Sequence, residues 1–98
     1  MIELDKYDMV LVEWEDSRTP QSRWQWVDEL DAPLVVSCMT LGTLIGKTEE
    51  AVQIAQTLGD LNGSRLQCNG VIEIPRRAIK TIQYVYGSEI YKEKANGN

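Results

Sequence analysis

The chain contains no histidine and no phenylalanine, and it has only two cysteines. Histidine is the usual general base near neutral pH and the commonest metal ligand. A structural zinc site usually needs four Cys or His ligands, so Cys38 and Cys68 cannot complete one. Each cysteine lies in an apolar stretch, where we expect a small core residue. A disulfide would require neighbouring strands and an oxidising compartment.

Motifs of the common enzyme classes are also missing. No serine lies in a Gly-x-Ser-x-Gly turn. The segment Gly42–Thr48 resembles a phosphate-binding loop, but three residues separate its glycines where the P-loop has four. Acidic side chains such as Asp16 and Glu13 could hold a metal, although charged loop tips are usually solvated. We therefore predict a protein that is not an enzyme and needs no cofactor.

Long hydrophobic runs are absent as well. No segment approaches the roughly 20 apolar residues of a membrane-spanning helix, since polar residues and a glycine interrupt the longest one, Leu34–Ile45. The N-terminus lacks the positive start and apolar centre of a secretory signal. These features predict a cytoplasmic protein that does not contact a membrane.

The charge is acidic and unevenly distributed. The 98 residues carry a net charge of −5, which argues against a general nucleic-acid coat protein. Residues 1–31 contribute −6, residues 32–63 contribute −2 and residues 64–98 contribute +3, which returns −5. In the last part Arg76, Arg77 and Lys80 are close in sequence. They either form a local anion site or are solvated surface cations.

The apolar residues predict five strands, over residues 7–14, 34–45, 51–58, 66–74 and 81–86. In the first, Val10, Val12 and Trp14 share one face while Met9 and Leu11 share the other, which predicts burial on both sides.

Gly42 predicts a bend or bulge in the second strand. Residues 51–58 fit an amphipathic helix capped by Thr48 as well as they fit a strand. We choose the strand, because a lone helix would interrupt the succession of short strands. Pro75 ends the fourth strand, and a single 3₁₀ turn is expected before the fifth.

Five strands, a long first loop and a helical turn predict an all-β domain over residues 1–86, with a polar tail at 87–98. The layout resembles the small five-stranded Src-homology-3-like and Sm-like barrels, with the 3₁₀ turn before the last strand. Such barrels usually bind ligands through their loops rather than in deep catalytic clefts.

Several short motifs resemble those of a family of small phage and prophage proteins. They are Val12-Glu-Trp-Glu-Asp-Ser17, the pair Trp24 and Trp26, Asp28-Glu-Leu30, Cys38 to Ile45, and Ile74-Pro-Arg-Arg-Ala-Ile79. The family more often has Ser-Val-Gly-Trp/Phe-Leu where this chain has Thr40-Leu-Gly-Thr-Leu44, so no role is carried over to Thr43. The resemblance covers about residues 8–85. It implies a phage origin and a strand at 51–58, but no activity.

The candidate ligand-binding residues are Trp14, Asp16, Ser17, Trp24, Trp26, Arg76 and Arg77. Tryptophan suits stacking on a base or anchoring an interface, unless Trp14 and one other tryptophan fill the core. Asp16 and Ser17 either bond a ligand or cap the loop. Arg76 either binds a phosphate or pairs with the acidic half of the chain.

Three functions are compatible with these residues. The first is a phage accessory protein that counters host defence by binding a host protein or a nucleotide signal in the host cytoplasm. The second is an Sm-like module that binds single-stranded nucleic acid, and the third is a small structural protein of the virion. Exposed edge strands would allow a homo-oligomer in each case.

Overall fold

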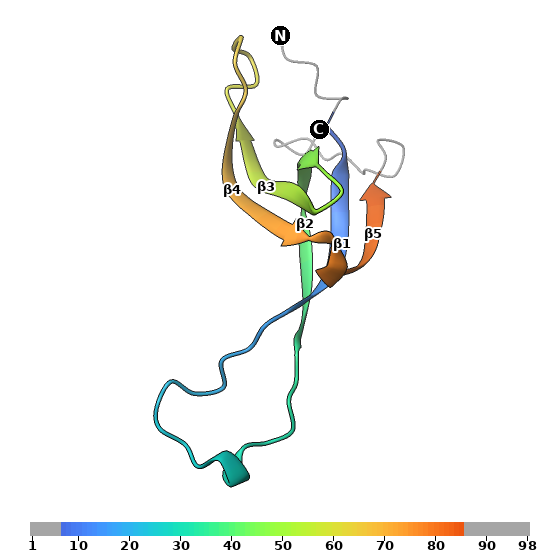
Figure 1. The fold of residues 1–98 in the computed structure, drawn as a ribbon. Helices are drawn as coiled ribbons and strands as arrows, with labels where there is room; N and C mark the ends of the chain where they lie inside the picture. Colours follow the sequence, from blue (N-terminus) through green and yellow to red (C-terminus); the bar gives the residue numbers. More distant parts are fainter. Residues whose placement is uncertain (1–6, 86–98) are drawn as a thin grey trace, which may run out of the picture.

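A computed structural model describes residues 7–85 of the chain (Figure 1). Its five strands and two 3₁₀ turns are β1 (Met9–Asp16), η2 (Val27–Glu29), β2 (Val36–Lys47), β3 (Ala51–Gly59), β4 (Gln67–Pro75), η3 (Arg76–Ala78) and β5 (Ile79–Val85). The strands form one antiparallel sheet in the order β4-β3-β2-β1-β5. The predicted all-β class, the five strands and the 3₁₀ turn before the last strand are confirmed. The expected tail at 87–98 lies outside the described residues.

The core lies on one face of the curved sheet. Its largest fully buried side chains come from three strands: Val10 and Val12 of β1, Val52 and Ile54 of β3, and Ile74 of β4. The predicted core face of the first strand is therefore correct. Burial on its second face is not, because Met9 is exposed and Leu11 is only partly buried. The outer side of β1 is thus only partly covered within residues 7–85.

Strand β2 changes partners along its length. Residues 36–43 pair with β1, whereas the ladder with β3 begins at Thr43 and contains a bulge between Leu44 and Gly46. Gly42 lies where the two ladders meet, and a Cβ there would come 2.6 Å from Ile54 Cγ2 and 2.7 Å from the Ala55 carbonyl oxygen. The predicted bend at Gly42 thus has a steric cause, since β3 approaches too closely for any side chain.

The segment 51–58 is a strand, as predicted, and Thr48 explains why it resembled a helix. The Thr48 hydroxyl oxygen accepts hydrogen bonds from the backbone N–H groups of Glu50 (3.2 Å) and Ala51 (3.1 Å). A helix N-cap makes the same type of contact, but here it closes the tight turn between β2 and β3. Thr48 therefore does cap the backbone as the sequence pattern indicated, although the element that follows is a strand.

Arg76 joins η3 to that same turn. Its backbone N–H donates to the Glu50 carbonyl oxygen at 2.8 Å, and its side-chain Nε donates to the Thr48 carbonyl oxygen at 2.6 Å. These two bonds connect segments separated by more than twenty residues. They join the start of η3 to the β2–β3 turn and continue the β3–β4 pairing beyond Ala51 and Pro75.

The two cysteines correct one expectation. Cys68 is exposed on β4 and Cys38 is only partly buried on β2, so neither is a fully buried core residue. Both are free thiols, because β3 separates their two strands in the sheet.

Candidate functional site

Between β1 and β2 the chain forms a long projection, residues 17–35, which we call the arm. Figure 1 shows it leaving the ends of the two paired strands and running away from the sheet, with η2 at its far end. Every residue of the arm is exposed. Its only regular structure is η2, held by two bonds: Glu29 N–H to the Trp26 carbonyl oxygen (3.1 Å) and Leu30 N–H to the Val27 carbonyl oxygen (3.4 Å).

The arm sequence explains why it forms no strand. Pro20 and Pro33 flank it near both ends and remove two backbone donors. Between them, residues 23–30 would place Trp24 and Trp26 on the same side if the segment were extended. The structure instead places the η2 turn there, and no strand of the described chain lies beside it to form a ladder.

The arm is nevertheless rich in large apolar side chains. Of the twelve exposed large hydrophobic residues in the described part of the chain, six belong to it: Trp24, Trp26, Val27, Leu30, Leu34 and Val35. Trp24 is 102% exposed and Trp26 is 75% exposed, so neither packs against the rest of the protein. Large exposed apolar surfaces on soluble proteins usually mark interaction sites.

The three tryptophans therefore separate into two groups. Trp14 is partly buried against the core, and its Nε1–H donates to Thr40 Oγ1 at 2.9 Å. It is a structural residue that bridges β1 and β2. The interpretation in which a second tryptophan fills the core is wrong, because Trp24 and Trp26 are both exposed on the arm.

Asp16 and Ser17 form the base of the arm. The Asp16 carboxylate accepts a hydrogen bond from the Ser17 backbone N–H at 2.7 Å, so the aspartate organises the point where the chain leaves β1. This contact agrees with the capping interpretation of the pair. The Ser17 hydroxyl has no hydrogen-bond partner within residues 7–85.

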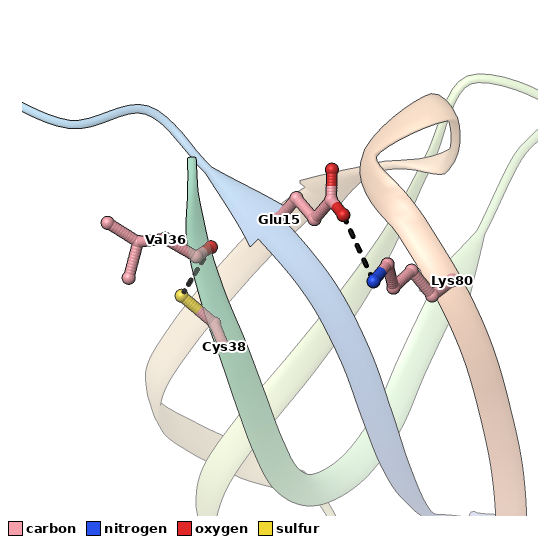
Figure 2. Close-up of polar contacts among 4 residues, drawn as sticks. All are labelled: Glu15, Val36, Cys38 and Lys80. Atoms are coloured by element: carbon pink, nitrogen blue, oxygen red, sulfur yellow. Dashed lines mark hydrogen bonds and ion pairs between the residues drawn. The ribbon is translucent and has the colours of Figure 1, made fainter. Parts of the chain in front are cut away.

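Two further polar contacts hold the strand ends beside this base (Figure 2). Lys80 Nζ lies 3.1 Å from Glu15 Oε1 and joins β5 to β1. On β2, the Cys38 thiol donates to the Val36 carbonyl oxygen at 3.6 Å. Because the ion pair is exposed, it contributes only a few tenths of a kcal/mol, up to about 1. The ends of β1 and β2, where the arm leaves the sheet, are joined to each other by the pairing of Asp16 with Val36.

The arginines lie at a different place. Arg76 lines a shallow hollow with Lys47, Thr48 and Glu49, while Trp24 lines one with Ser22, Arg23, Gln25 and Leu30. The structure therefore does not bring Arg76 and the exposed tryptophans into one cavity.

An anion site at the two arginines is also opposed by their surroundings. Arg77 and Arg76 share a second hollow with three carboxylates, those of Glu49, Glu50 and Glu73. These charges offset the local positive potential that a phosphate would need. Arg76 pairs with the Thr48 carbonyl oxygen rather than with the acidic N-terminal half, and Arg77 makes no ion pair in the described part of the chain.

The arm itself is mildly acidic. Arg18 and Arg23 precede the tip, and Asp28, Glu29 and Asp31 lie at and after η2, which gives the arm a net charge of 2 − 3, or −1. None of the three acids forms an ion pair with another described residue. The tip therefore presents apolar side chains next to unpaired carboxylates.

Trp24 and Trp26 were predicted from the sequence as candidate binding residues, but the aliphatic residues around them were not. Val27, Leu30 and Leu34 carried a usable signal, since they lie between two prolines in a stretch without strand alternation. The sequence shows that these residues are apolar, but it does not show that they are exposed to solvent.

Among residues 7–85 no cluster of His, Cys, Asp and Glu could hold a metal ion, and no helix there is long and apolar enough to cross a membrane. No protein-family model, curated protein or solved structure matches this chain.

Proposed function

We propose that this chain is a non-enzymatic binding protein that uses the arm to engage a host protein, as an accessory factor of a phage. The observation that carries the proposal is the exposed apolar surface of residues 24–35. The phage origin and the role in countering host defence are supported by the motif resemblance, the small size and the lack of a catalytic motif.

The shape of the arm favours a protein partner over a nucleotide. A nucleotide is usually held in a concave pocket with a few convergent polar groups. Here both tryptophans are exposed on the arm, which extends away from the sheet (Figure 1), and Arg76 lines a separate hollow. Tryptophan anchors spaced along a projecting segment instead resemble the hot-spot residues of protein interfaces.

The available area suits an interface. A buried tryptophan contributes roughly 150–250 Å², and a standard interface buries about 800 Å² on each partner. Trp24 and Trp26 together therefore supply roughly 40–60% of one side. Val27, Leu30, Leu34 and Val35, all more than half exposed, supply much of the remainder.

We also propose that the sheet is a small barrel of the Src-homology-3-like or Sm-like type, with the arm as its first loop. The strand order, the two-partner strand β2 and the 3₁₀ turn between β4 and β5 support this assignment. The Arg76 bonds to Thr48 and Glu50 fix η3 beside the β2–β3 turn, directly before β5 begins. In such a fold the loops are the usual binding elements.

The test compares the wild-type chain with the double variant Trp24→Ala/Trp26→Ala. A matched control, Leu61→Ala/Val71→Ala, removes two exposed apolar side chains away from the arm. Each protein is immobilised and incubated with extract from host cells. The host proteins that it retains are quantified by mass spectrometry. A protein retained by the wild type and the control, but not by the arm variant, is then purified. We expect its affinity for the arm variant to be at least about 100-fold weaker, as for loss of two interface anchors.

Two outcomes would contradict the proposal. In one, no retained protein depends on the tryptophans. In the other, native mass spectrometry of the chain from infected cells shows a retained nucleotide whose binding survives the arm substitutions. The second result would mean that the protein binds a small ligand at a site on the sheet rather than a host protein on the arm.

A further inference from the structure

Strand β2 carries a second unpartnered feature, distinct from the arm. Residues 36–42 pair with β1 on one side, but among the described residues the ladder with β3 covers only Thr43–Lys47. Within residues 7–85, the other side of the first half of β2 is therefore an open strand edge, whose N–H and C=O groups no neighbouring strand pairs. Such edges are templates for pairing with another chain unless charge, proline or a covering segment blocks them.

Within residues 7–85, neither a charged side chain nor a proline blocks this edge. Residues 32–46 contain no charged side chain, and the only proline in that stretch, Pro33, precedes β2. The accessible part of the edge includes Val36, Met39 and Leu41, whose exposures are 40%, 69% and 60%. The edge is therefore uncharged and carries three accessible apolar side chains, in a chain whose net charge is −5.

We propose that this edge pairs with the same edge of a second copy of the chain, antiparallel and about a two-fold axis at Met39. The absence of charge is what favours a second copy. A symmetric pairing of an acidic strand would set like charges opposite each other, which destabilises a sheet. Here an axis at Met39 sets Met39 against itself, Ser37 against Leu41 and Cys38 against Thr40, and all of these are neutral.

The geometry also limits where the axis can lie. In antiparallel pairing about a two-fold axis, the residue on the axis faces its own copy, so the axis must pass through a residue. Gly42 is buried against Ile54 and Ala55 and closes one end of the edge. The arm begins before Val36 at the other end, so Met39 is the middle of the free stretch 36–42. The resulting dimer carries two arms, and this inference does not depend on what the arms bind.

The experiment is sedimentation equilibrium of the full chain over a concentration series, with Met39→Lys as the test variant and Leu61→Lys as the matched control. Both replace an exposed apolar residue by lysine, but Leu61 lies outside β2. We expect a wild-type dimer, a dissociation constant raised roughly tenfold by Met39→Lys because two lysines face each other, and no change in the control. Mixing Met39→Lys with Met39→Glu should restore dimers, because opposite charges then meet at the axis.

A monomer at every concentration, or a dimer that Met39→Lys does not weaken, overturns the proposal. Recovery in the mixture also shows that the lysine variant is folded.

The double variant Trp24→Ala/Trp26→Ala should still dimerise. If it loses the dimer while Met39→Lys keeps it, the second copy binds the arm and the edge proposal is wrong. A dimer that persists without arm-dependent capture of a host protein would contradict only the proposed function.

Discussion

The sheet and the arm use similar amino acids for opposite purposes. In the sheet, Val10, Ile54 and Ile74 are buried and held by ladders on neighbouring strands. In the arm, Val27, Leu30 and Trp24 are equally apolar but are exposed to water. The difference is the availability of a partner: each core residue has a strand beside it, while the arm has none within the described chain. Apolar residues stabilise the fold only where the topology supplies that partner.

The largest expected effect separates the two regions by stability. Ile54→Ala removes most of a side chain that is 1% exposed, so we expect the free energy of unfolding to fall by about 2–5 kcal/mol. Val27→Ala, in the arm, should change it by less than about 0.5 kcal/mol, because Val27 is 85% exposed. Urea unfolding followed by circular dichroism measures both. Equal losses would mean that the arm contributes to the folded core.

A smaller effect is expected where β2 changes partners. Gly42→Ala places a methyl group 2.6 Å from Ile54 Cγ2 and 2.7 Å from the Ala55 carbonyl oxygen, and such overpacking costs about 1–3 kcal/mol. Gly59→Ala is the matched control within the same sheet, since the nearest atom to its new Cβ is 3.9 Å away. Thermal unfolding should show a lower midpoint for Gly42→Ala only. A neutral Gly42 variant would show that β3 moves aside freely.

The smallest effect tests the contact that ties η3 to the β2–β3 turn. Arg76→Met keeps much of the side-chain length but removes the Nε–H donor to the Thr48 carbonyl oxygen, which should cost about 1 kcal/mol. Arg77→Met removes the same charge from a residue that makes no ion pair in residues 7–85, so its unfolding midpoint should stay near the wild-type value. Equal losses in the two variants would assign the effect to charge rather than to the hydrogen bond.

The candidate site was predictable only in part. Trp24 and Trp26 stood out because tryptophan is rare and these two are close together, and Asp16 and Ser17 because they follow a strand. Arg76 stood out through its charge, yet the structure engages it with the backbone of Thr48 and Glu50. An arginine that bonds a backbone carbonyl oxygen and an arginine that binds a phosphate look the same in the sequence. Here the carbonyl partners of Arg76 lie more than twenty residues away along the chain, so the sequence around Arg76 does not reveal them.

The sequence by itself determined the local elements. Two-residue alternation marked the strands, Pro75 and the residues after it marked the 3₁₀ turn, and Gly42 marked the bend. These features depend on neighbours along the chain, which the sequence contains. Only the tertiary structure decided which apolar residues are covered, why Thr48 caps a turn instead of a helix, and which side of β2 stays open. Those outcomes depend on which distant segments come to lie beside each residue. The hydrophobicity of a residue does not show which segment that is.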